Sequence, residues 1–264
     1  MSFDLAHAAV PFRMQPGLQR LDSGARHLTP LAPGSPLWQE KNRVVASGAS
    51  RLAVPGFDPQ APISAILARA RSEGFAAHDP IELAFEEDFA LLDGASTTLP
   101  WLCVSVPSHW APEDKLGLAF HSVHAPVADN HALVAAGRQL VQLVTGGGHF
   151  ERFVWTLTPS GRYDQHPRRH GREPWPATAE PVGFAGQCWL RSERQTFFPV
   201  PGVPGQAIFT IRVMLQPLPD AVRSADDARR LHDSLASMSD AVLEYKGLAP
   251  ARERLLAWLA HRGA

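Results

Sequence analysis

Two strand-like runs late in the chain, 189–198 and 208–215, constrain the fold more than any other feature. Both contain β-branched and aromatic residues, and the segment 199–205 between them holds three prolines and two glycines. Two such runs around a turn-rich segment predict an antiparallel hairpin with a long loop. The chain is therefore expected to build a sheet around this hairpin.

The first run carries an unusual amount of charge for a strand. In an extended chain one face holds Arg191, Glu193 and Gln195, and the other holds Ser192, Arg194 and Thr196. Because a solvated edge accounts for only one polar face, a polar site is the economical interpretation. Two alternatives stay open: a charged edge strand that prevents edge-to-edge aggregation, and a structural Arg–Glu pair.

The rest of the chain predicts an α+β order. Strands are expected at 101–106, 118–123, 152–157, 187–197 and 207–215. Helices are expected from Pro62 to Gly74, from 79 to 88, from 225 to about 246 after a Ser224 cap, and from Pro250 onward. Helices thus cluster near both ends of a central antiparallel sheet, without the βαβ alternation of a parallel sheet.

Composition narrows the class of protein. A chain of 264 residues that is 45% hydrophobic can bury one core, so a single domain over 1–264 is expected. A formal net charge of −1 gives no overall field that would recruit nucleic acid or an anionic membrane. The two cysteines, Cys103 and Cys188, are too few for a disulfide framework or a Cys-rich metal site. Without a secretory pattern or an 18-residue apolar run, a cytoplasmic protein is expected.

Several short motifs follow one another along the chain. They are Pro11-Phe-Arg-Met14, Gly17-Leu18, Glu87–Leu92, Pro107–Trp110, Lys115-Leu-Gly117, His124-Ala-Pro-Val127, Phe153-Val-Trp155, Leu190–Thr196 and Phe209–Arg212. Together they resemble the haem-dependent oxidative N-demethylase family, typified by the α-subunit of dimethylamine monooxygenase, over roughly residues 10–220. The resemblance implies a haem-binding PAS-like domain that oxidises a small secondary amine to a smaller amine and formaldehyde. It further implies O₂ as a substrate and a separate flavin or iron–sulfur reductase as a partner.

A histidine is the expected iron ligand. Haem needs a strong axial donor, an apolar slot and cations for its propionates. His124 lies in the family-like His-x-Pro-Val motif, where Pro126 would stiffen the loop, so the resemblance makes His124 the candidate metal ligand. His109 and His121 are the alternatives, and a structural histidine is the plainer interpretation of any of them. Because no Cys-x-x-Cys-His motif occurs, the haem is expected to be a non-covalent haem b.

The polar strand supplies the other site candidates that the resemblance implies. Glu193 would bind the ammonium group of a protonated amine and accept its proton, while Gln195 and Thr196 would hydrogen-bond a ligand on the iron. The cofactor-binding candidates share a guanidinium that can fork onto a propionate: Arg191, Arg194 and Arg212. A structural cross-strand pair of Glu193 and Arg212 is an open alternative.

Two further classes of protein compete with the oxygenase. One is a haem-binding PAS-like sensor or non-catalytic subunit, and the other is a haem-free structural subunit. The chain has no flavin or nicotinamide motif and no Cys set for an iron–sulfur cluster, so an oxygenase would depend on its partner for electrons. A Soret band in the purified protein would separate the haem-binding classes from the haem-free one.

Overall fold

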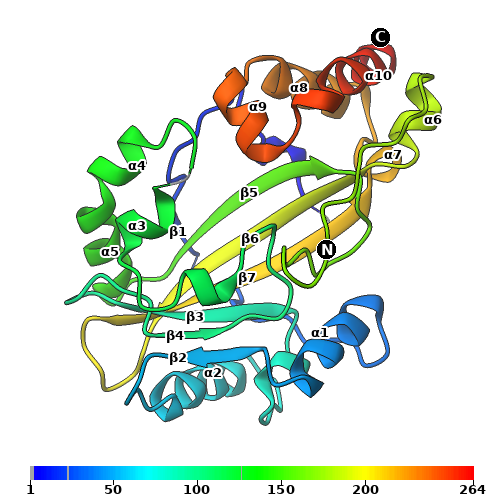
Figure 1. Cartoon of the computed structure of the whole chain (residues 1–264). Coiled ribbons are helices and arrows are strands. Elements are labelled where there is room, and N and C mark those ends of the chain that lie inside the picture. The colour runs from blue at the N-terminus through cyan, green and yellow to red at the C-terminus, as the bar shows by residue number, and fades with distance from the viewer. Residues whose placement is uncertain (1–2, 23, 126) are drawn as a thin grey trace.

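A single antiparallel sheet organises the computed structural model, which describes residues 3–22, 24–125 and 127–264. Within these residues the sheet has seven strands in the order β1-β5-β6-β7-β3-β4-β2 (Figure 1). Their bounds are β1 Gln19–Arg20, β2 Arg51–Ala53, β3 Glu87–Asp93, β4 Trp101–Cys103, β5 Phe150–Thr158, β6 Trp189–Pro199 and β7 Gln206–Pro217. With the helices around it, this sheet confirms the α+β class. The PAS-like detail and the single domain over 1–264 stay predictions.

The β6–β7 hairpin forms as expected. The two strands pair without interruption from Trp189 opposite Pro217 to Pro199 opposite Ala207. On its other side β6 pairs with β5 from Trp189 to Phe197. Because both edges of β6 are hydrogen-bonded, the alternative that it is a charged edge strand is wrong. Its two polar faces therefore need another explanation.

Helices surround the sheet in three groups (Figure 1). Near β2 lie α1 Pro36–Ala46 and α2 Gln60–Ser72, and beside β1 lie α3 Phe120–His124, α4 His131–Ala135 and α5 Gly137–Thr145. The third group is α6 Pro181–Ala185, α7 Leu218–Ala221, α8 Ala225–Ala236, α9 Asp240–Lys246 and α10 Arg252–Gly263. Four short 3₁₀ turns complete the described elements: Leu5–His7, Ile81–Leu83, Pro112–Asp114 and Ala249–Ala251. None of the described helices has the length and apolar character to cross a membrane.

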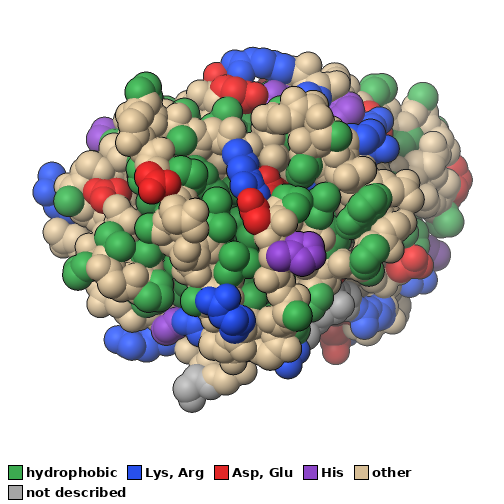
Figure 2. All heavy atoms as spheres, turned by 90° about the horizontal axis from the view of Figure 1, so that it is seen from below, with side chains coloured by type: hydrophobic (Ala, Val, Ile, Leu, Met, Phe, Trp, Pro, Cys, Tyr) green, Lys and Arg blue, Asp and Glu red, His purple; other side chains and the backbone are tan. Residues whose placement is uncertain are grey.

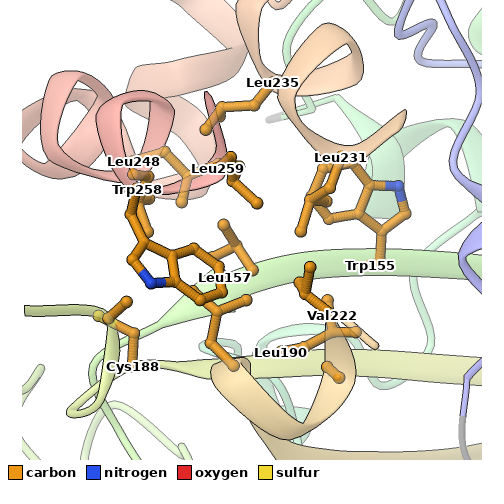
Figure 3. Close-up of a cluster of buried hydrophobic side chains, with 14 of the residues drawn as sticks. Trp155, Leu157, Cys188, Leu190, Val222, Leu231, Leu235, Leu248, Trp258 and Leu259 are labelled. Atoms are coloured by element: carbon orange, nitrogen blue, oxygen red, sulfur yellow. The ribbon is translucent and has the colours of Figure 1, made fainter. Parts of the chain in front are cut away.

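The two faces of the sheet are named here after adjacent residues of β6, the Glu193 face and the Arg194 face. On the Arg194 face Trp155, Leu157 and Leu190 pack against α8 and α10 in the cluster of Figure 3. At the other end of this face Phe198 and Ile208 pack against α2. The Glu193 face is covered in part by α5, against Phe150 and Phe197. Both faces are therefore buried, and polar residues on either face need partners.

Two expected elements are wrong. Residues 118–123 were expected as a strand, but Phe120–His124 form a one-turn helix in which the His124 Nδ1 contacts the Phe120 carbonyl at 2.8 Å. Residues 79–88 were expected as a helix, but one 3₁₀ turn is followed by β3 from Glu87. Because β3 is central and buried on both faces, its continuous apolar run 89–92 carries no alternation that identifies a strand.

The expected helix over 225–246 is broken into α8 and α9. Its start is confirmed, since Ser224 and Asp227 form a reciprocal capping box. The break follows because Ser239 caps a new helix, accepting from the Val242 amide at 3.2 Å. Gly247 ends α9 with a left-handed φ of 67°, as expected for a C-terminal glycine.

The proline-rich segment 29–36 lies along the sheet. Leu31 is buried, and its amide donates to the Ala84 carbonyl at 3.0 Å. It packs with Leu37, Ile211 and Val213 in one apolar cluster. The segment is thus a covering strap. Cys103 and Cys188 are buried free thiols.

Candidate functional site

Glu193 lies in the middle of β6 and accepts two side-chain hydrogen bonds. Its Oε1 accepts a short hydrogen bond from Ser108 Oγ, and its Oε2 accepts from Gln195 Nε2 at 2.7 Å. Ser108 Oγ in turn accepts from Arg191 Nε at 2.7 Å. Arg191 therefore reaches Glu193 only through Ser108. The carboxylate is held in one orientation on its face of the sheet.

Arg191 uses its whole guanidinium inside the protein. It is 1% exposed, and its terminal nitrogens donate to the Val106 carbonyl at 3.1 Å and the Arg162 carbonyl at 3.2 Å. Burial lowers the pKa of Arg191 to about 10, while the charge of Glu193 opposes that shift. Arg191 thus stays charged at neutral pH and orients Ser108 instead of offering donors to a ligand.

Arg152 lies beside Gln195 in the β5–β6 register and is not among the residues predicted from the sequence. Its buried Nε has no hydrogen-bond partner, and no hydrogen bond or ion pair of its guanidinium occurs within the described part of the chain. Burial lowers the pKa of Arg152, and the negative charge of Glu193 acts against that effect. The residue as a whole is half-buried, and a buried N–H group without a hydrogen bond is costly unless a further group accepts from it. The sequence signal was one arginine inside the otherwise strand-like run 150–158.

His124 ends α3, on the side of the molecule that also carries Arg152. Its Nδ1 lies 2.8 Å from the Phe120 carbonyl, and its ring packs against the Phe120 ring in a tilted arrangement with the centroids 4.2 Å apart. Burial lowers the pKa of His124, and the charges of Arg152 and Lys115 add to that effect. The ring is therefore neutral at pH 7, with its proton on Nδ1 and a free lone pair on Nε2. Pro126 lies outside the described residues.

A small cavity joins the His124 helix to Arg152. It measures about 20 Å³ and is lined by apolar side chains, Phe120 and Phe197 among them, with Arg152 as its charged member. His109 lies elsewhere, near Arg191 and Arg172, whose charges add to the effect of burial and lower its pKa to about 4. His121 is exposed. Of the three candidate histidines, His124 is the one linked to this cavity.

The surroundings of Glu193 are rich in positive charge. Lys246 at the end of α9 donates from Nζ to the Trp155 carbonyl at 2.8 Å, and burial lowers its pKa to about 8. Glu193 favours the charged form of Lys246, whereas Arg152 disfavours it. Burial raises the pKa of Tyr245, the charge of Glu193 adds to this effect, and the charge of Arg152 opposes it. Two cations thus face one carboxylate, which favours an additional anionic group near Arg152.

Arg194 and Thr196 point to the opposite face and already have partners. Arg194 binds Glu151 through Nε at 3.0 Å and a terminal nitrogen at 2.9 Å. Thr196 Oγ1 lies 2.7 Å from Thr210 Oγ1 and 3.1 Å from His27 Nδ1. Thr196 is therefore not brought together with Gln195.

Arg212 also lies on the Arg194 face. It is opposite Arg194 in the strand register, and its Nε donates to Glu86 Oε2 at 2.6 Å. Val213, not Arg212, lies opposite Glu193. The alternative of a structural Glu193–Arg212 pair is therefore wrong. The charged residues of the polar strand separate into two unrelated sets.

Other surface and metal features are sparse. In the view of Figure 2 the Lys and Arg side chains are scattered and interspersed with Asp and Glu, without a broad patch of one sign. No group of three or more His, Cys, Asp or Glu side chains that could hold a metal ion occurs among the described residues.

The chain belongs to the family described as haem-dependent oxidative N-demethylase, alpha subunit-like, whose model matches residues 71–256. The matched range begins after the N-terminal fragments 11–14 and 17–18 and continues past residue 220 into α10, so it differs from the expected span of 10–220. It includes His124, Arg152 and Glu193. At the family level, the role is that of a haem-dependent oxidative N-demethylase-like protein.

The donor set around Arg152 fits a haem. His124 offers a neutral imidazole nitrogen whose ring is oriented by a carbonyl, and Arg152 offers an unpaired guanidinium for a propionate. Phe120 and Phe197 supply apolar surface. Since ligand pockets measure roughly 300–1,000 Å³, the cavity of about 20 Å³ must widen to admit a macrocycle. The larger cavity of about 360 Å³, at the edge of β7, has no histidine in its lining.

Proposed function

We propose that this chain is a haem-dependent monooxygenase that demethylates a small, dimethylamine-like secondary amine, releasing a smaller amine and formaldehyde. One observation carries the proposal: a half-buried arginine without hydrogen bonds among the described residues, Arg152, lies beside Glu193 and Gln195 and acts electrostatically on His124. A cation, a carboxylate and a neutral imidazole together match what haem and a protonated amine require.

In this proposal His124 holds the iron of a non-covalent haem b through Nε2, and Arg152 binds a propionate. We assign the propionate to Arg152 in place of Arg194 and Arg212. Arg194 already binds Glu151 through two nitrogens, and Arg212 lines the larger cavity, which has no histidine. A bound haem would supply activation of O₂ with electrons from a separate flavin or iron–sulfur reductase. The family description, alpha subunit-like, supports a partner of this kind.

Glu193 would bind the amine. A secondary amine arrives protonated, and a carboxylate fixed by Ser108 and Gln195 can pair with the ammonium without reorganising. Glu193 then holds the proton, which leaves the nitrogen lone pair free for oxidation. Gln195 orients Glu193 and would hydrogen-bond a ligand on the iron. Thr196 has no part in this arrangement, because its hydroxyl is bound on the other face.

Haem titration of the purified chain tests the proposal. We expect a Soret band that His124→Ala weakens or shifts, while His109→Ala and His121→Ala leave it unchanged. Arg152→Gln should lower haem affinity by about tenfold or more, the loss of one charge-assisted hydrogen-bond pair. The matched control is Arg194→Gln, which removes a guanidinium from the opposite face of the same strand pair and should leave haem affinity unchanged.

The outcomes separate the competing classes. No Soret band after hemin addition would exclude both haem-binding classes and leave the haem-free subunit. A Soret band that never responds to dimethylamine would favour the sensor or non-catalytic subunit over the oxygenase. Because the cavity must widen, haem loading should also speed or slow amide hydrogen exchange in α3–α5, and unchanged exchange there would move the haem elsewhere.

A further inference from the structure

A second cavity lies along the outer edge of β7 and is independent of the site at Arg152. Its volume is about 360 Å³, and it shares no lining residue with the small cavity at Arg152. β3 pairs with β7 only as far as Arg212, opposite Glu87, whereas β7 continues to Pro217. The edge from Val213 onward therefore borders the cavity instead of another strand. The strap at Leu31, the start of α1 and Tyr163 enclose its other sides.

Two polar side chains in the cavity wall have unused donors. Arg212 is 7% exposed, and its Nε donates to Glu86, but its two terminal nitrogens make no hydrogen bond within the described residues. Ser192 is 2% exposed, and its hydroxyl has no hydrogen-bond partner in the same part of the chain. Because Ser192 is opposite Met214 and Arg212 is opposite Arg194, the two are diagonal neighbours on one face of adjacent strands. One ligand group can contact both.

The rest of the cavity wall is mainly apolar. Phe3, Leu37, Leu190 and Met214 line it. A dry cavity of 150 Å³ holds one benzene, so a cavity of about 360 Å³ has room for a molecule of roughly a dozen non-hydrogen atoms. An apolar cavity with a few convergent polar groups is the usual form of a small-molecule site.

We propose that this cavity binds an organic monocarboxylate with an apolar body of about that size. The guanidinium has five N–H donors, and Glu86 uses only the Nε side, so the edge formed by the terminal nitrogens can bind a second carboxylate bidentately. Ser192 Oγ donates to the same carboxylate. The apolar body packs against Phe3 and Leu190.

Titration calorimetry of the full chain with 4-phenylbutyrate tests this site. We expect 4-phenylbutyrate to bind, and 4-phenylbutylamine and 4-phenylbutanol to bind at least about tenfold more weakly, because only the carboxylate accepts from Arg212 and Ser192. Arg212→Gln should weaken 4-phenylbutyrate by about tenfold or more and Ser192→Ala by severalfold. Arg194→Gln is the matched control, since Arg194 also binds a carboxylate but does not line the cavity.

Several outcomes would overturn the proposal. Tighter binding of the amine would mean that Glu86 governs the cavity, and equal binding of all three compounds would mean that only apolar contacts matter. If Arg212→Gln does not fold, Ser192→Ala and the cavity-filling Met214→Trp decide, and wild-type affinity in both would refute the site. So would an absence of binding by every compound.

Haem distinguishes this site from the one at Arg152. We expect 4-phenylbutyrate to bind the apo and haem-loaded chain equally. If hemin displaces 4-phenylbutyrate, and Arg212→Gln loses the Soret band while Arg152→Gln keeps it, the cavity holds haem propionates instead of a separate monocarboxylate. That result would overturn both placements. Loss of the Soret band in Arg152→Gln alone, without displacement, would support both.

Discussion

The two faces of β6 carry similar residues that have different roles. On the Arg194 face, Arg194 binds Glu151 through two nitrogens, Arg212 binds Glu86 through Nε, and Thr196 is hydrogen-bonded to Thr210. On the Glu193 face, Arg152 has a buried Nε without a hydrogen bond.

The difference indicates that Arg194 serves stability and that Arg152 serves a ligand. Paired buried groups stabilise or are neutral, whereas an unpaired buried cation destabilises the protein and persists where function needs it. Strand alternation brings the two sets within one residue of each other in the sequence without any contact between them. Substituting one residue on each face tests whether the two faces differ in function.

The largest effect is expected at Glu193. Glu193→Gln keeps the shape and removes the charge, so an amine cation loses its partner in a partly desolvated site. The loss is of order ~3 kcal/mol, or roughly a hundredfold in rate. Formaldehyde release from dimethylamine by the haem-loaded chain, with a chemical reductant and O₂, measures it. The amine-induced spectral shift should vanish while the Soret band stays.

Glu151→Gln is the control for this experiment. It removes a carboxylate paired with Arg194, across the same two strands but on the opposite face, and turnover should change by less than about threefold. If both variants lose activity equally, the two faces are not functionally distinct. If Glu193→Gln loses haem or unfolds, Glu193 is a structural residue.

The sequence predicted the polar strand because its signals are local. The turn-rich segment 199–205 predicts the hairpin, and the period of two assigns Glu193 and Arg194 to opposite faces. The resemblance to the family, and not the local strand pattern, pointed to His124. By contrast, the short run 118–123 gave no local reason to choose a strand or a helical turn, and the Phe120–His124 contact decided for the helix.

The pairing of charges could not be read from the sequence. Arg212 pairs with Glu86 and Arg194 pairs with Glu151 because of how β3 and β5 align with the hairpin, and this alignment is a long-range property of the fold. Arg152 could not be predicted for the same reason, since the lack of a hydrogen-bond partner for its Nε is visible only in the folded chain. Local pattern therefore identified the strand, and tertiary register assigned the roles.

An intermediate effect, on the pH dependence of stability, is expected from His27, which contacts Thr196 at the end of the polar network on the Arg194 face. His27 is 2% exposed, and its Nε2 lies 2.8 Å from His149 Nδ1. Burial, with the charges of Arg69, His149 and Arg194, lowers its pKa to about 3 from the ordinary 6.5. Between pH 6.5 and pH 3 the His27 ring is protonated in the unfolded chain and neutral in the folded chain. The contribution of His27 to stability is therefore fully present above pH 6.5 and is lost as the pH decreases below that value.

The expected slope is about 1.4 kcal/mol per pH unit, or ~2 kcal/mol lost at pH 5. His27→Gln should flatten the dependence of the free energy of unfolding on pH between 6.5 and 4, as measured by urea titration. His121→Gln, at an exposed position, should leave the slope unchanged. An unchanged slope in His27→Gln would mean that His27 is protonated in the folded chain and that this face is less fully paired than described.

The smallest effect compares the two arginines directly in the haem-free chain. Arg152→Met removes a half-buried cation whose buried Nε has no hydrogen bond, and it should raise the free energy of unfolding by ~1 kcal/mol, even though Glu193 loses a neighbouring charge. Arg194→Met leaves Glu151 without its partner and should lower it by ~1 kcal/mol. Urea unfolding measures both. With haem bound, Arg152→Met should be less stable than wild type, because a ligand stabilises the folded state more when it binds more tightly. Equal destabilisation by both variants without haem would show that Arg152 is structural, and the contrast between the two faces would no longer point to a ligand.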